Sequence, residues 1–226
     1  GAYGQLPGRD FNPLDLLLLL RTVQIRISFR VKRPDQAPGV SNQKRNAVTQ
    51  SGFGFLTGSA QHQRCSIVGT NGADVIHALG GNDFVRGRGG DDVICGGDGN
   101  DLIAGNEDND TIDGEGGRDR ALYGGSTPVN ANLAAGTAIG QGNDDLIAIE
   151  DLSGSSGADT LRGNAGPNRL WGFGGEDTLI GLGGNDILTG GPGPDALNGG
   201  PGNDFCNGSV GLGDTAVNCE TTQFVP

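Results

Sequence analysis

The sequence predicts an all-β protein built from short repeats, and three observations carry that prediction. Aspartate recurs at nine-residue intervals in two blocks, an apolar residue follows two places after each aspartate, and glycine supplies 45 of the 226 residues. Only 5% of the residues are aromatic and 34% are hydrophobic, so large side chains that could fill a thick core are scarce. We therefore expect a thin core that is repeated along the chain.

The acidic positions keep their nine-residue spacing twelve times, with Asn168 as the one replacement of aspartate. The aspartates are Asp74, Asp83, Asp92, Asp101, Asp110, Asp119, Asp159, Asp177, Asp186, Asp195 and Asp204. The residues two places further on are Ile76, Val85, Ile94, Ile103, Ile112, Ala121, Leu161, Leu170, Leu179, Leu188, Leu197 and Cys206. Because side chains alternate between the faces of a strand, each unit is predicted to be a glycine-rich turn and a strand of about three residues with its apolar side chain inward. A disordered Gly/Asp-rich tract would not need an apolar residue at one fixed phase.

Three segments show the repeat in full: GGDGNDLIA at 96–104, GGPGPDALN at 190–198 and GGPGNDFCN at 199–207. They resemble the RTX (hemolysin-type) calcium-binding nonapeptide repeats, whose pattern is G-G-x-G-x-D-x-U-x with U a large aliphatic residue. The resemblance extends over residues 69–119 and 154–207. It implies a parallel β-roll, a β-solenoid in which two repeats form one coil, so that every second aspartate stacks on the same edge.

The stacked carboxylates are the predicted ligands of Ca²⁺. Two bare carboxylates one strand spacing apart, ~4.8 Å, repel each other by ~1 kcal/mol in water. Calcium reverses this repulsion and accepts oxygen ligands in flexible geometry, whereas magnesium demands a stricter octahedron. The eleven aspartates are expected to supply charge, and glycine carbonyls in the turns are expected to supply further oxygens. These glycines, each two residues before an acidic position, are Gly72, Gly81, Gly90, Gly99, Gly157, Gly175, Gly184, Gly193 and Gly202. With one ion between two stacked acids, the chain would bind up to about eight calcium ions, most weakly beside Asn168.

The chain is predicted to consist of a basic segment followed by two acidic repeat blocks. Residues 1–64 hold nine Lys or Arg and three acids, and we expect a cap strand at 22–32 and a linker at 33–64. The first block is residues 65–121, and the second, with a C-terminal cap, is residues 154–226.

The connecting segment, residues 122–153, does not keep the nine-residue period. Its apolar residues mark short strands, so we expect a spacer that continues the roll with irregular coils. The alternative is that Asp144 and Asp145 bind an extra ion.

Four cysteines without C-x-x-C spacing favour structural disulfides in an oxidising compartment over a zinc site. Cys206 and Cys219 are close in sequence and form a plausible pair, which leaves Cys65 with Cys95 by default. The sequence alone allows three connectivities. No apolar run is long enough to span a bilayer, and we expect the protein to be secreted, at the cell surface or extracellular.

The formal net charge of −12 argues against nucleic acid as a partner and favours cations. No catalytic motif is present, and the repeated acids are a poor arrangement for giving two carboxyls different environments, so we do not expect an enzyme. The leading hypothesis is an extracellular calcium-binding β-roll that folds on binding Ca²⁺ and acts as a monomeric structural or surface-interaction module. The alternative is a detached C-terminal accessory domain of a larger secreted enzyme or toxin.

Overall fold

The computed structural model describes residues 46–48, 54–59, 64–210 and 213–225, all within the compact unit Lys44–Pro226. These residues form strands and turns and no helix, as the sequence predicts. In that part of the chain there is accordingly no helix long and apolar enough to cross a membrane.

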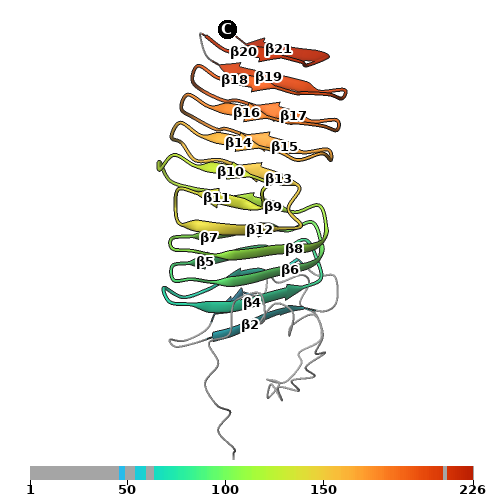
Figure 1. The fold of residues 1–226 in the computed structure, drawn as a ribbon. Helices are drawn as coiled ribbons and strands as arrows, with labels where there is room; N and C mark the ends of the chain where they lie inside the picture. Colours follow the sequence, from blue (N-terminus) through green and yellow to red (C-terminus); the bar gives the residue numbers. More distant parts are fainter. Residues whose placement is uncertain (1–45, 49–53, 60–63, 211–212, 226) are drawn as a thin grey trace, which may run out of the picture. The chain divides into compact units, whose positions relative to one another are not determined.

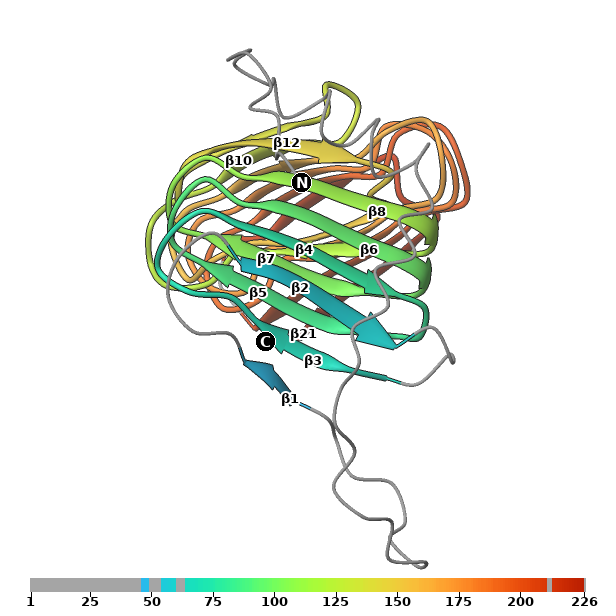
Figure 2. The same cartoon turned by 90° about the horizontal axis from the view of Figure 1, so that it is seen from below.

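The strands of the repeats alternate along the chain between two sheets that face each other (Figure 1, Figure 2). Sheet A contains, in spatial order, β1 (Asn46–Val48), β3 (Ser66–Val68), β5 (Phe84–Arg88), β7 (Leu102–Asn106), β9 (Arg120–Leu122), β13 (Asp151–Ser153), β15 (Arg169–Trp171), β17 (Ile187–Thr189), β19 (Phe205–Val210) and β21 (Thr221–Val225). Sheet B contains β2 (Gly54–Ser59), β4 (Asp74–Leu79), β6 (Val93–Gly99), β8 (Thr111–Gly117), β12 (Asn143–Ile147), β11 (Thr137–Ile139), β10 (Asn130–Asn132), β14 (Thr160–Arg162), β16 (Thr178–Ile180), β18 (Ala196–Asn198) and β20 (Thr215–Val217).

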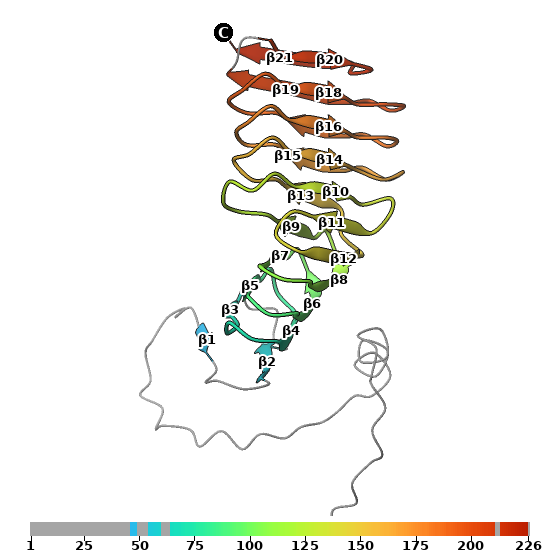
Figure 3. The ribbon, with the colours of Figure 1, turned by 60° about the vertical axis from the view of Figure 1, so that its left-hand side comes forward.

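Neighbouring strands of the repeats pair in parallel and align equivalent positions. Ile76 of β4 is aligned with Ile94 of β6, and Ile94 is aligned with Ile112 of β8. Leu161 of β14 is aligned in the same way with Leu179 of β16. One strand of each sheet therefore makes one coil, as Figure 3 shows for β14 to β21. The predicted parallel β-roll is confirmed.

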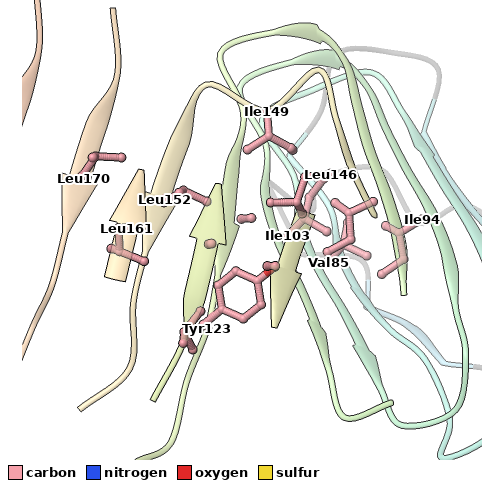
Figure 4. Packing of buried hydrophobic residues seen from close by; sticks show 14 of the residues in the cluster. Val85, Ile94, Ile103, Tyr123, Leu146, Ile149, Leu152, Leu161 and Leu170 are labelled. Atoms are coloured by element: carbon pink, nitrogen blue, oxygen red, sulfur yellow. The ribbon is translucent and has the colours of Figure 1, made fainter. Parts of the chain in front are cut away.

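The apolar side chains of the repeat fill the space between the two sheets. All twelve side chains at this position are at most 2% exposed. Figure 4 shows Ile94, Ile103, Leu161 and Leu170 among the side chains packed in this interior. Burial of one such side chain contributes about 1.5–3 kcal/mol, so the thin core gains its stability by repetition.

The connecting segment adds a hairpin to sheet B. β12 pairs in parallel with β8, and β10 pairs in parallel with β14, which continues the sheet between the blocks. Between them, β11 pairs antiparallel with both β10 and β12. The spacer does continue the roll, but these two pairings depart from the parallel pattern because the chain reverses twice, in the turn 133–136 and again at residues 140–142.

Two strands lie inside the range predicted as a linker. β1 and β2 pair with β3 and β4, so each sheet begins before the first aspartate of the repeat. The predicted cap strand at 22–32 lies outside the described residues.

Cys206 and Cys219 form the predicted disulfide, with their Cα atoms 6.0 Å apart. The default pairing of Cys65 with Cys95 is wrong, because no disulfide joins them. Cys65 directly precedes β3 of sheet A, whereas Cys95 lies in β6 of sheet B. The two residues therefore belong to different sheets of the roll.

Candidate metal centre

Apart from Asp74 and Asn168, the side chain at each acidic position of the repeat accepts a hydrogen bond from a backbone N–H of the preceding coil. The N–H of Asp74 donates to Oδ1 of Asp92 at 2.7 Å, and the N–H of Asp92 donates to Oδ1 of Asp110 at 2.9 Å. The N–H of Asp159 donates to Oδ1 of Asp177 at 2.8 Å in the second block. The other such bonds run from Asp83 to Asp101, Asp101 to Asp119, Asn168 to Asp186, Asp177 to Asp195 and Asp186 to Asp204. The structure thus stacks acids that lie two repeats apart and leaves all twelve positions at most 3% exposed.

The second carboxylate oxygen of most stacked aspartates is buried without a hydrogen-bond partner. These oxygens are Oδ1 of Asp74 and Oδ2 of Asp83, Asp92, Asp101, Asp110, Asp119, Asp177, Asp186, Asp195 and Asp204. Buried polar atoms in folded proteins are nearly always paired, and an unpaired ionised oxygen is costly. A bound hard cation would satisfy such atoms, because calcium is coordinated by oxygen alone.

A glycine five residues before the aspartate leaves the space that these oxygens face. A Cβ atom on Gly96 would lie 2.5 Å from Oδ2 of Asp101 and 2.9 Å from the carbonyl oxygen of Gly114. A carboxylate oxygen and a carbonyl oxygen therefore border one small space that a side chain would fill. The sequence alone did not indicate a role for these glycines. They could have been noticed because glycine recurs five residues before the acidic positions, with Ala78 as the exception.

The nine glycines that were predicted to offer carbonyl oxygens lie in the turns. Seven of them have φ between +90° and +159°, and Gly72 and Gly157 are the exceptions. A Cβ atom on Gly99 would collide with the carbonyl oxygen of Gly81, one coil earlier. Successive turns therefore approach each other closely here, while the role of these glycines as ligands stays a prediction.

Burial raises the pKa of eight of the stacked carboxyls. In the first block the pKa of Asp110 is raised to about 8, and the pKa of Asp92 and Asp119 to about 7. Desolvation is the main cause, neighbouring carboxylates add to it, and the hydrogen bond from the backbone opposes it. In the second block the pKa of Asp177 and of Asp186 is raised to about 6, again mainly by burial. A divalent cation bound here would stabilise the ionised form and compete with protons.

Four acids outside the regular spacing extend the stacks, and of these the sequence suggested only Asp144, as part of an alternative ion site with Asp145. In the first block, the N–H of Asp110 donates to Asp144 at 3.1 Å and the N–H of Asp119 donates to Glu150 at 2.8 Å. In the second block, the stacks end at Asp214, which accepts from Asp195 at 2.9 Å, and at Glu220, which accepts from Asp204 at 2.5 Å. Their separations of 34, 31, 19 and 16 residues from their donors differ from the regular 18, so the period could not reveal them.

The geometry suits a cation held by carboxylates and backbone carbonyls together. No group of three or more His, Cys, Asp or Glu side chains gathers as a metal cluster among the residues that the structure describes. The repeated elements are one unpartnered carboxylate oxygen, a glycine without a side chain and a neighbouring carbonyl oxygen. Such oxygen ligands fit calcium rather than a transition metal.

The fold and these acid stacks define a calcium-binding β-solenoid. A model of the RTX calcium-binding nonapeptide repeat matches the chain four times, at residues 68–103, 96–126, 153–188 and 180–211, which together make up just over half of its length. The chain therefore belongs to the RTX calcium-binding repeat family. A search of curated proteins finds no match.

Proposed function

We propose that this protein is an extracellular module that folds into its β-roll on binding several calcium ions and then serves as a structural or surface-interaction element. The observation that carries the proposal is the row of buried, unpartnered carboxylate oxygens along both edges of both blocks. Without a cation these oxygens oppose folding, and with calcium they stabilise it. The affinity expected for an extracellular module of this kind is ~10⁻⁴–10⁻³ M.

The compartment and the absence of catalysis are parts of the same proposal. The disulfide between Cys206 and Cys219 favours an oxidising environment, which supports secretion. The acids recur at equivalent positions of the repeat, each stacked on another carboxyl, an arrangement that suits cation binding better than acid–base catalysis. A monomeric, non-enzymatic role therefore fits the described residues best.

The charge contrast along the chain favours one alternative. Residues 1–64 are basic and the repeat region is acidic, as expected if the β-roll is an accessory domain of a larger secreted enzyme or toxin. The gene sequence upstream of this chain would decide, because a catalytic domain there supports the accessory role.

Circular dichroism with and without calcium tests the main proposal. We expect little β signal in excess chelator and a β-rich spectrum in millimolar calcium, with magnesium as a poor substitute. An unchanged β spectrum in chelator, with the metal shown by elemental analysis to be gone, would sink the proposal.

A further inference from the structure

One acid stack continues across the connecting segment through a residue outside the repeats. Asp110, the last regular acid of its stack, donates its N–H to Oδ1 of Asp144 in β12 at 3.1 Å, although 34 positions separate the two. Asp144 is 3% exposed, whereas the next residue, Asp145, is exposed. The matched repeats end at residue 126 and resume at residue 153, so Asp144 belongs to none of them.

Two buried oxygen atoms of the junction have no hydrogen-bond partner: Oδ2 of Asp110 and Oε1 of Gln141. Tyr123 is 2% exposed, and Figure 4 shows its ring inside the roll. Burial, the charge of Asp144, a hydrogen bond to Asp144 and then the charge of Asp110 raise the pKa of Tyr123, so its hydroxyl lies against the Asp144 carboxyl. Gln141 Nε2 donates to the carbonyl of Gly124, the neighbour of Tyr123, at 3.0 Å.

The opposite edge of the junction has its own positive charge. Arg118 donates two hydrogen bonds to Asp151, at 2.6 and 3.0 Å. Asn168 follows Glu150 on that edge and donates from Nδ2 to the carbonyl of Glu150 at 2.7 Å.

Among the described residues, no positively charged side chain takes the place of Arg118 on the edge that holds Asp110 and Asp144. The charged neighbours that shift the pKa of Asp110 and of Asp144 are all carboxylates. Ionisation of Asp110 and Asp144 would therefore bring two carboxylate charges together, with no positive side chain among the described groups that shift their pKa.

We propose that Asp110 and Asp144, together with Gln141 and the Tyr123 hydroxyl, form an additional calcium site at the junction of the two blocks, outside the repeats. The inference rests on the proposed function, because it extends the calcium-binding stack to residues that do not follow the repeat. Carboxylate, amide and phenol oxygens form an oxygen-only ligand set, which suits a hard cation with six to eight ligands. An ion at this site would tie the last coil of the first block to the hairpin.

Calcium counting with matched variants is the first test. Asp144→Asn preserves an oxygen acceptor for the N–H of Asp110 but removes a charge, and we expect it to bind about one calcium ion fewer than the wild type. Asp145→Asn removes the same charge from the adjacent exposed residue and should bind the wild-type number. Calorimetry and elemental analysis of the full chain would give both counts.

Terbium luminescence is the second test, because Tb³⁺ replaces Ca²⁺ and is excited through a nearby aromatic ring. In a Trp171→Phe background, which removes the tryptophan, we expect sensitised emission that is lost in Tyr123→Phe and in Asp144→Asn and kept in Asp145→Asn. Tyr123→Phe retains both carboxylates, so it remains informative if Asp144→Asn does not fold.

The outcomes separate this site from the function of the whole protein. A wild-type chain that binds no calcium would overturn the proposed function. A wild-type chain that binds calcium, with an equal ion count in Asp144→Asn or with emission that persists in Tyr123→Phe, would overturn the junction site alone.

Discussion

The two repeat blocks share one period but differ in the strands they form. In the first block the inward residues are β-branched, apart from Ala121, and β4 to β8 are five to seven residues long. In the second block the inward residue is leucine in five successive repeats, and β14 to β18 are three residues long. β-Branched side chains favour extended backbone, whereas leucine does so less. The aspartate and glycine pattern is thus common to both blocks. Strand length differs with the inward residue, longer with β-branched residues and shorter with leucine.

The blocks also differ in the source of their stability. Burial raises the pKa to about 8 at Asp110 and to about 7 at Asp92 and Asp119 in the first block, although Asp101 reaches only about 6. In the second block Asp177, Asp186 and Asp195 reach about 6. The second block contains Asn168 in place of an acid and is closed by the disulfide between Cys206 and Cys219. We infer that the first block depends more on calcium, and the second more on neutral and covalent contacts.

Removal of a central acid should have the largest effect. Asp101 lies inside a stack, between Asp83 and Asp119, whereas Glu220 ends one. If neighbouring acids share ions, Asp101→Ala removes about two calcium ions and disrupts the first block, while Glu220→Ala removes about one and loosens only the end. Titration calorimetry and hydrogen exchange would measure both. Equal losses in the two variants would show that each turn binds its own ion.

In the absence of calcium, lowering the pH should stabilise the folded first block more than the folded second block. A carboxyl whose pKa is higher in the folded than in the unfolded state stabilises the fold at low pH, and this contribution is lost as the pH rises through the folded pKa. For Asp92 and Asp110 that loss falls near pH 7 to 8, and for Asp195 near pH 6.

Hydrogen exchange in chelator between pH 8 and pH 5 measures this effect block by block. Protection should return to the first block at a higher pH than to the second. With calcium bound, the sign reverses, because protons then displace the ion. Simultaneous recovery of both blocks in chelator would contradict the electrostatic difference between them.

A methyl group in the space beside a carboxylate should weaken calcium binding moderately. Gly96→Ala places a Cβ atom 2.5 Å from Oδ2 of Asp101, and such overpacking costs about 1–3 kcal/mol, or roughly a tenfold loss of affinity. Gly80→Ala is the control in the same block, because apart from its chain neighbours the nearest atom to its Cβ atom would be 3.8 Å away. Calcium titration should separate the two variants, and equal affinities would exclude a role for this space.

Exchange of the inward residue types should have the smallest effect. Ile94→Leu and Leu179→Ile conserve volume, and each should change the free energy of unfolding by less than about 1.5 kcal/mol. If the inward residue controls strand length, Leu179→Ile should increase amide protection at the ends of β16, and Ile94→Leu should reduce it at the ends of β6. Unchanged protection in both would assign strand length to the turns instead.

The sequence predicted those parts of the structure that repeat. One phase of nine residues was enough to place the inward residues and both stacks, because each coil has the same surroundings as its neighbours. The hairpin of β10 and β11 has no repeat and was not foreseen. Asp144 and Glu220 also lie in the stacks, but 34 and 16 residues separate them from their hydrogen-bond donors instead of the regular 18. Only the folded backbone shows that they reach these positions. The pairing of Cys65 with Cys95 was also wrong, because sequence spacing does not tell how two side chains lie in the folded chain.

The hydrogen bonds between coils give the solenoid a direction. Each aspartate of the repeat after Asp74 receives on Oδ1 an N–H from the coil before it, so a bare first coil would present acceptors and a bare last coil would present donors. Water or a cation readily satisfies a carboxylate acceptor. The final donors, those of Asp195 and Asp204, need acceptors from the chain itself, and Asp214 and Glu220 supply them. Two rolls joined through their end coils would therefore match head to tail and never head to head. Truncation from the C-terminal side would leave N–H donors unsatisfied, whereas truncation from the N-terminal side would leave acceptors.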